Sequence, residues 1–223
     1  MQIHSSQDKN ICNPIAFGAI KVATAKNCIR GKETIIDIYR LTRKDKEVIN
    51  YLEKSTHYEE LVPQVEEIMQ ERWQKVFQYC IEEIKEGYNQ NFVAIAEHRP
   101  CGVLTYYANE ALAYLDGVCK IPKKKSDNVR LIGKSLILKF LKSASKEKSQ
   151  KISLDAVKDG PIDVISIYEK LGFKKIYRIC NNEYQPMEMS KYKLKESINK
   201  LEKLIDYTES QSLEEVNLFD IIG

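Results

Sequence analysis

The sequence lacks the features of several large classes of protein. It contains no run of about 18 apolar residues, which excludes a membrane-spanning helix within this sequence. Its three histidines are scattered and its six cysteines form no C-x-x-C pair, so it offers no zinc site. The net charge of +3 gives no whole-protein basic excess of the kind that nucleic acids or acidic membranes attract. No internal repeat is visible.

What is present is the composition of an ordinary globular protein. Of the 223 residues, 43% are hydrophobic and 30% are charged, and this length fits one domain with additional segments at its ends. Cys80, Cys101 and Cys119 fall inside apolar periodic segments, so we expect buried, reduced thiols and no disulfide framework. The apolar stretch from Ile11 to Ala25 is interrupted by polar residues and follows no basic cluster, which disfavours a signal peptide. These observations together predict a cytoplasmic protein that contacts no membrane.

Hydrophobic periodicity divides the chain into three predicted parts. Residues 1–32 show no lasting period and read as an N-terminal extension, residues 33–190 form the main domain, and residues 191–223 form a helical tail. Within the main domain the pattern predicts strands at 36–39, 92–97, 101–107, 112–119, 151–157, 173–179 and 187–190, and helices at 45–53, 63–87, 131–144 and 163–171. In the tail, Ser212 to Glu215 has the pattern of a capping box that opens a short helix. Antiparallel candidates followed by a strand–helix–strand unit favour an α+β fold with a mixed, mostly antiparallel central sheet flanked by helices.

A predicted helix start follows a basic loop and has the features of an anion site. Arg130-Leu131-Ile132-Gly133-Lys134-Ser135 opens the helix, where free backbone N–H groups and the positive end of the helix dipole favour a phosphate. Gly133 would let the backbone approach such an anion closely. The letters Gly-Lys-Ser do not make a P-loop, because Asn128 stands where that motif requires a glycine.

This helix start resembles the acetyl-CoA pyrophosphate loop of the GNAT acetyltransferases, Arg/Gln-x-x-Gly-x-Gly/Ala. Arg130 and Gly133 match that pattern, and Ser135 is a small residue at its last place. Further along, Tyr168-Glu-Lys-Leu-Gly-Phe173 is similar to the GNAT motif that ends the helix after the strand that diverges at the CoA site. Pro161 and Val164 depart from the asparagine and alanine common in that family. The resemblance implies a GNAT-like architecture over residues 33–190 and acetyl-CoA as co-substrate.

The resemblance also implies roles for particular residues. Acetyl-CoA would lie along residues 115–119, where this strand parts from residues 151–157, and Tyr168 would be the general acid that protonates the leaving thiolate. The implied cofactor-binding residues are Val118, Cys119, Lys120, Arg130, Leu131, Ile132, Gly133, Lys134 and Ser135. An amine acceptor with a pKa near 10 is mostly protonated at neutral pH, so a carboxylate or a water chain must accept its proton. Asp116 and Glu97 are the candidate bases.

We therefore expect an N-acetyltransferase in which a small-molecule or protein amine attacks acetyl-CoA directly. Two alternatives stay open. The departures at Ser135, Pro161 and Val164 would suit a module that keeps the fold and has lost turnover. The basic loop that contains Lys123, Lys124 and Lys125 would suit an acetyltransferase acting on aminoacyl-RNA, although nucleic acid is otherwise not an expected partner.

Overall fold

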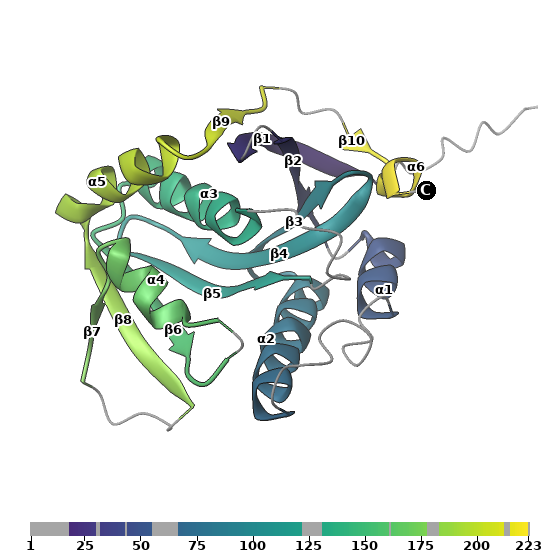
Figure 1. Ribbon diagram of the computed structural model, residues 1–223. Coiled ribbons are helices and arrows are strands. Elements are labelled where there is room, and N and C mark those ends of the chain that lie inside the picture. Colours follow the sequence, from purple (N-terminus) through teal and green to yellow (C-terminus); the bar gives the residue numbers. More distant parts are fainter. Residues whose placement is uncertain are drawn as a thin grey trace, which may run out of the picture.

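The computed structural model describes residues 18–29, 32–42, 44–54, 67–121, 131–160, 162–177, 183–211 and 215–222. These residues form one ten-stranded sheet with helices on both of its faces (Figure 1). The strands are β1 (Ala19–Ile29), β2 (Lys32–Leu41), β3 (Gln90–Ala96), β4 (Arg99–Ala108), β5 (Leu112–Lys120), β6 (Lys151–Val157), β7 (Lys174–Lys175), β8 (Tyr184–Ser190), β9 (Asp206–Glu209) and β10 (Glu215–Val216). The helices are α1 (Lys46–Lys54), α2 (Glu67–Glu86), α3 (Ile132–Lys146), α4 (Val164–Lys170), α5 (Lys191–Glu202) and α6 (Leu218–Ile222).

The sheet is mixed and mostly antiparallel, as the sequence predicted. Its order is β10-β1-β2-β3-β4-β5-β6-β8-β7, with β9 also paired to β1. Among the described strands, β5 and β6 form the parallel pair and every other pairing is antiparallel. The adjacent strands predicted at 92–97 and 101–107 form an antiparallel hairpin, β3 and β4. Its turn lies at Glu97 and His98, which both have positive φ, so β4 begins two residues before the predicted strand. Two residues with positive φ form the tight turn whose twist suits a hairpin, and Pro100 is consequently part of β4.

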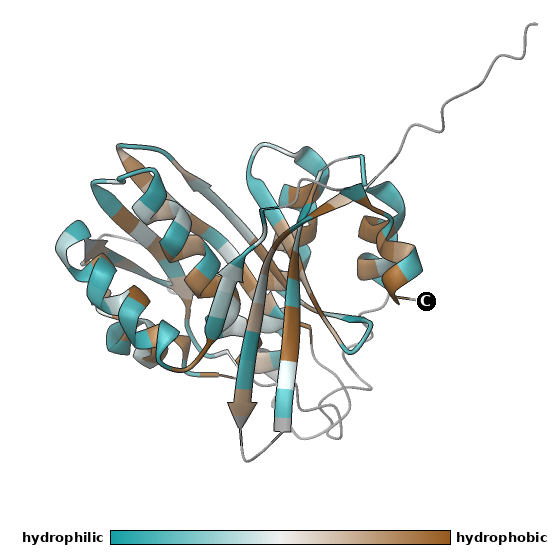
Figure 2. Ribbon diagram, turned by 90° about the horizontal axis from the view of Figure 1, so that it is seen from above, coloured by the Kyte–Doolittle hydropathy of each residue, from teal (hydrophilic) through white to brown (hydrophobic). Residues whose placement is uncertain are grey.

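Two apolar clusters hold the layers together. On one face of the sheet, α3, α4 and α5 bury residues such as Phe140, Tyr168 and Leu201. On the other face, α1, α2 and α6 bury residues such as Leu52, Phe77 and Leu218. In Figure 2 these helices carry both apolar and polar residues. This is the pattern of amphipathic helices, which bury their apolar side against the sheet.

The two ends of the described chain meet at one edge of the sheet. β1 pairs with β2 on one side, and on the other side with β9 through Ala23 to Lys26 and with β10 through Ala19 and Ile20. The predicted tail therefore contains two short strands as well as helices. Glu215 belongs to β10, so the last helix begins at Leu218 and not at the predicted capping box, of which residues 212–214 lie outside the described residues. The division of the chain at residues 32 and 190 stays a prediction.

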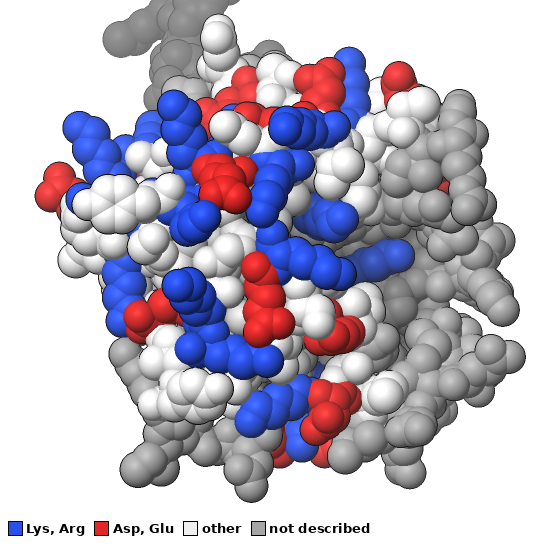
Figure 3. All heavy atoms as spheres, turned by 60° about the vertical axis from the view of Figure 1, so that its left-hand side comes forward, with Lys and Arg blue, Asp and Glu red and all other residues white. Residues whose placement is uncertain are grey.

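Other expectations from the sequence can be compared directly. Cys80, Cys101 and Cys119 are buried free thiols, as predicted, and Cys28 is exposed. Of the strand predicted at 173–179, the described part forms β7 at Lys174 and Lys175, and residues 178 and 179 lie outside the described residues. No helix in the described ranges is long and apolar enough to cross a membrane. On the face drawn in Figure 3, basic and acidic side chains are interspersed, in keeping with the nearly balanced net charge.

Candidate active site

The sheet opens where β5 and β6 diverge. These strands pair through four residue pairs, from Leu112 with Lys151 to Leu115 with Leu154, and then separate. In Figure 1, β5 continues to the right while β6 runs downward. A cavity of about 330 Å³ lies at this divergence and is lined by residues of α2, β5, β6 and α4, together with Tyr184 at the start of β8. The volume falls in the range of small-molecule sites.

A β-bulge at Asp116 determines which side chains enter this cavity from β5. Thr105 of β4 is opposite Gly117, and Tyr106 is opposite Leu115, so Asp116 is the additional residue on β5. Before the bulge, Leu115 packs in the cluster on the α3 side of the sheet, whereas after it Cys119 packs in the cluster on the α2 side. A bulge re-aims the side chains of a strand in this way. Asp116 faces α2, on the side opposite to Leu115, and the bulge changes the side taken by the residues that follow it.

Asp116 is held by two donors and lies near a second carboxylate. Tyr79 Oη in α2 donates to Oδ1 at 3.4 Å, and Asn89 Nδ2 donates to Oδ2 at 2.7 Å. The same Asn89 amide nitrogen also donates to Oε2 of Glu83 in α2. Burial, and secondly the negative charge of Glu83, raise the pKa of Asp116 to about 6, against the opposing effect of the two hydrogen bonds. A carboxylate in this pKa range is suited to general base catalysis near neutral pH.

Tyr168 enters the cavity from the other side of the sheet. Asp163 caps the start of its helix α4 by accepting a hydrogen bond from Ser166 N at 3.0 Å, and Gly172, with φ of 94°, follows the helix. Tyr168 is 5% exposed, and its ring packs edge-to-face on Phe173, with 5.6 Å between ring centroids. Its hydroxyl has no hydrogen-bond partner among the residues that the structure describes. Burial raises the pKa of Tyr168 well above its ordinary value, so the phenol stays protonated and able to donate.

The start of α3 has free backbone donors and open space above it. Leu131 precedes the helix in the left-handed conformation, with no side-chain cap, and the first turn contains no acidic residue. A Cβ added to Gly133 would meet no atom within 4 Å, and Ser135 Oγ is buried without a hydrogen-bond partner in the described residues. Gly102 of β4 lets this turn pack closely, because a side chain there would meet Ile132 and Leu136. These features fit the phosphates of a nucleotide cofactor, although Arg130 lies outside the described residues.

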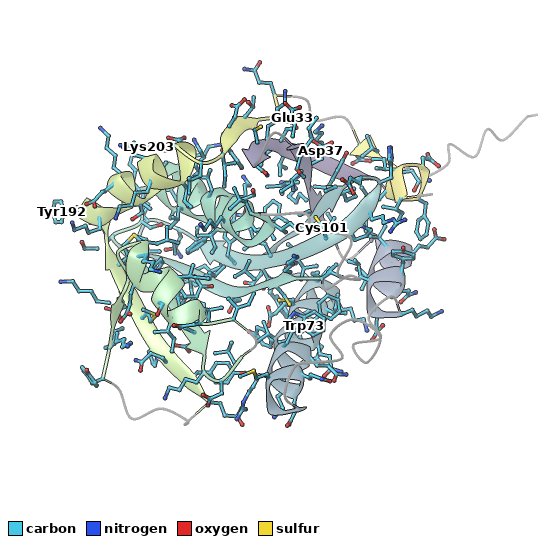
Figure 4. All side chains as sticks on the ribbon, in the orientation of Figure 1. Glu33, Asp37, Trp73, Cys101, Tyr192 and Lys203 are labelled. Carbon is cyan, nitrogen blue, oxygen red and sulfur yellow. The ribbon has the colours of Figure 1, made fainter. Side chains whose placement is uncertain are left out.

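The other predicted site residues occupy different positions. Val118 lines the cavity together with Asp116 and Tyr168. Cys119 is buried in the cluster beside α2, and Lys120 is exposed at the end of β5. The carbonyl of Lys120 accepts a hydrogen bond from Trp73 Nε1 at 3.0 Å, and Figure 4 labels Trp73 between α2 and β5. Glu97 lies in the β3–β4 turn beside α6, where its neighbour His98 contacts the carbonyl of Ile221, and it is not among the residues that line the cavity.

Sequence reasoning missed several polar residues that line or support the cavity. Tyr79, Tyr114, Asp155 and Tyr184 line it, and Asn89 connects two carboxylates beside it. Tyr114 Oη donates to Asp155 Oδ2 at 3.0 Å and so connects the two diverging strands. The alternation of residues 112–120 places Tyr114 and Asp116 two positions apart, which could have indicated a shared face. No comparable signal in the sequence indicates Asn89.

Comparison with known proteins agrees with the architecture. No protein-family model matches the chain, and no curated protein matches it either. Among solved structures, an uncharacterized protein from Bacillus halodurans is similar over 82% of this chain and 98% of its own, with 11% identity and a TM-score of 0.55. FdhC, a nucleotide-linked sugar GNAT, matches over 83% and 97% of the two chains with 16% identity and a TM-score of 0.49. The PaiA N-acetyltransferase from Thermoplasma acidophilum, in complex with coenzyme A, matches over 70% and 98% with 20% identity and a TM-score of 0.46.

At these identities a structural likeness shows the fold alone. The architecture itself is informative, because a mostly antiparallel sheet contains one described parallel pair, β5 and β6, that diverges after four residue pairs. Helix α3 connects these two strands, and α4 follows the second of them. The chain therefore has a GNAT-like fold, as its sequence motifs predicted.

Proposed function

We propose that this protein transfers an acetyl group from acetyl-CoA to an amine, by direct attack of the amine on the thioester in a ternary complex. One observation carries the proposal. Asp116, with a pKa of about 6, and the buried Tyr168, whose hydroxyl has no described protein partner, line the same cavity at the divergence of β5 and β6. A base and an acid on opposite sides of one small cavity suit a reaction that removes one proton and supplies another.

Asp116 is the proposed general base. The attacking amine must be neutral, and an alkylammonium group with a pKa near 10 must therefore lose a proton. Asp116 is mostly ionised at pH 7 and is more basic than an ordinary carboxylate, because burial penalises its charge. Asn89 and Tyr79 fix its orientation through their hydrogen bonds. Glu97 is a weaker candidate because it lies outside the cavity.

Tyr168 is the proposed general acid. An ammonium acceptor first loses one proton to solvent water and becomes neutral. As the nitrogen–carbon bond forms and the carbon–sulfur bond breaks, the second proton of the nitrogen passes to Asp116, and the Tyr168 hydroxyl gives its proton to the departing sulfur. Proton exchange with water then returns Asp116 to its ionised form and Tyr168 to its protonated form. The raised pKa of Tyr168 keeps the hydroxyl protonated until charge develops on that sulfur. Packing on Phe173 fixes the ring, so the hydroxyl needs little reorganisation during the step.

The acetyl donor is proposed to bind along β5 and across the start of α3. Acetyl-CoA supplies the activated thioester. The residues proposed to hold it are Val118, Cys119 and Lys120 through the open edge of β5, and Arg130, Leu131, Ile132, Gly133, Lys134 and Ser135 around its phosphates. Residues 116–120 of β5 have no partner in the register with β6, so the backbone of that edge is available to a ligand.

The proposal is tested with the purified protein, acetyl-CoA, a panel of amines and a thiol-detecting reagent, together with calorimetric titration of CoA. We expect CoA to bind and thiol release to depend on an amine. Binding of CoA without turnover of any amine would favour the inactive module, and absence of CoA binding would contradict both readings. Dependence on RNA would favour the aminoacyl-RNA alternative, whose basic loop with Lys123, Lys124 and Lys125 lies outside the described residues.

A further inference from the structure

The part of the cavity that faces α2 is acidic and aromatic. It is lined by the carboxylates of Asp116 and Asp155 and by the rings of Tyr79, Tyr114 and Tyr184. No lysine or arginine stands among the described residues that line the cavity. Because carboxylates and the faces of tyrosine rings both attract cations, this lining favours a positively charged ligand over a neutral or anionic one.

The two carboxylates stand on the two diverging strands. Asp116 is on β5, and Asp155 is on β6. On β6, Ile152, Leu154 and Ala156 pack in the cluster on the α3 side, so Asp155 faces the α2 side like Asp116. The Tyr114 hydroxyl, which donates to Asp155, connects the two strands across the opening.

The negative charge of this surface is not balanced by the described residues around it. Neither Asp116 nor Asp155 forms an ion pair within the described ranges, and their hydrogen bonds come from neutral donors. Glu83 adds a third carboxylate behind Asp116. The cations on the nearby turns of α2, Arg72 and Lys75, both form ion pairs with Glu183, next to Tyr184. A ligand would therefore have to supply the compensating charge.

A single reacting amine needs only one of these carboxylates. The proposed reaction uses Asp116. Tyr168 is an independent sign that a ligand enters this cavity, because the residue lines the cavity, is only 5% exposed, and has a hydroxyl without a described partner. Asp155 has no part in the proposed reaction. Together with the tyrosines beside it, it is therefore available to bind a second group of the same acceptor. A second ammonium group matches a carboxylate flanked by aromatic rings.

We infer that the acceptor is a di- or polyamine, whose reacting nitrogen lies at Asp116 and whose second ammonium group binds Asp155 with Tyr114 and Tyr184. This inference rests on the proposed acetyl transfer and deepens it, because it names the class of acceptor. It also gives β6 a function in recognition, in addition to its place in the sheet.

The test compares acceptors of equal length and different charge. The probes are 1,5-diaminopentane, 1-aminopentane and 5-aminopentanoate, with glucosamine as an amine that carries hydroxyl groups instead of a second charge. We expect kcat/KM for the diamine to exceed that for aminopentane by about tenfold, as a charge-assisted contact would give, with aminopentanoate the poorest. Equal use of diamine and monoamine, or a preference for glucosamine, would overturn the inference.

A variant locates the effect, and a matched control corrects for net charge. Asp155→Asn should reduce the ratio of diamine to monoamine kcat/KM towards one. Asp206→Asn, on the exposed strand β9 at the far edge of the sheet, removes the same charge away from the cavity and should leave the ratio unchanged. An unchanged ratio in Asp155→Asn would also overturn the inference.

Direct binding separates this inference from the proposed function. Calorimetry with each amine in the absence of acetyl-CoA should show tighter binding of the diamine than of aminopentane, and the difference should fall as salt is added. If the diamine binds in this way and no acetyl transfer occurs, the proposed function fails while the site for a dication stands. If acetyl transfer occurs and the diamine has no advantage in binding or turnover, the inference fails alone.

Discussion

The Sγ atom of Cys80 in α2 lies in the space that a side chain at Gly117 of β5 would occupy. The glycine therefore allows α2 to approach the strand directly beside Asp116. We expect Gly117→Ala to lower the free energy of unfolding by about 1–3 kcal/mol, because the added methyl group overpacks this contact. Denaturant unfolding measures the loss.

The partner residue provides the control for this prediction. In the double variant Cys80→Ala/Gly117→Ala the sulfur is absent, and the nearest atom of residue 80 is then a Cβ at 3.9 Å, which is an ordinary contact, while Thr105 Oγ1 at 3.2 Å stays as a tight neighbour in both variants. The double variant should regain much of the stability lost in Gly117→Ala. Wild-type stability of the single variant would contradict the close packing.

The pH dependence of acetyl transfer should report Asp116. Its pKa is raised to about 6, so the carboxylate is protonated and inactive as a base below that pH and ionised above it. We expect kcat/KM to rise with pH along an acid limb centred near 6. Glu83→Gln removes the second cause of the raised pKa and should move this limb to lower pH, whereas Glu82→Gln, on an exposed neighbouring position of α2, should not. A limb that stays fixed in Glu83→Gln would argue against Asp116 as the titrating group.

Removal of the base should separate activity from stability. Asp116→Asn keeps the size of the side chain and an oxygen that can accept from Asn89, but it cannot take a proton, so the transfer rate should fall by roughly 10²–10⁴-fold. Because the folded-state pKa of Asp116 is above its unfolded value, its ionised form destabilises the fold, and this cost grows as pH rises through about 4 to 6. The variant should therefore melt at the same or a higher temperature than wild type at pH 7. A lower rate accompanied by a lower melting temperature would indicate a structural role.

Tyr168→Phe tests the proposed acid. The ring and its packing on Phe173 are retained, and only the hydroxyl is lost. Single-turnover acetyl transfer should slow by roughly 10²–10⁴-fold while CoA affinity changes little. Equal single-turnover rates for a folded variant and wild type would remove Tyr168 from the mechanism.

Gly133 tests the start of α3 as the phosphate site. The position faces open space, so Gly133→Ala should fold normally and gain roughly 0.5–1 kcal/mol from its higher helix propensity. Gly133→Glu adds bulk and negative charge at the same place. We expect calorimetry to show a modest loss of CoA affinity for the alanine variant and a severe loss for the glutamate variant. Unchanged affinity in a folded Gly133→Glu variant would sink the assignment of the phosphates to this turn.

The helices and strands of the main domain were predictable because their apolar periodicity is long and regular. Strands β3 to β6 and helices α2 to α4 follow it closely. Strands β9 and β10 were missed because Asp206–Glu209 and Glu215–Val216 are short, polar segments whose pairing with β1 depends on tertiary contacts. The same tertiary contacts make Glu215 part of a strand, although local sequence suggested a helix cap.

The site was predictable in part. Tyr168 and Asp116 could be proposed from a motif and a strand pattern, and both line the cavity. The bulge at Asp116 could not be foreseen, because burial along β5 alternates regularly through it and the irregularity exists only in the pairing with β4. Asn89 and Glu83 reach Asp116 from 27 and 33 residues earlier in the chain, and no local pattern encodes such an approach.

The pairings of β1 must form in a fixed order during synthesis, because its partners on the two sides are far apart in the sequence. β1 can pair with β2 as soon as both are synthesised, but its outer edge has no partner until β9 and β10 are made, about 180 to 200 residues later. During that interval β1 presents unpaired backbone groups of the kind that recruit other strands. Strands β9 and β10 therefore cover a strand that is made about 180 to 200 residues before them, and a nascent chain that stalls in between would expose this edge to aggregation.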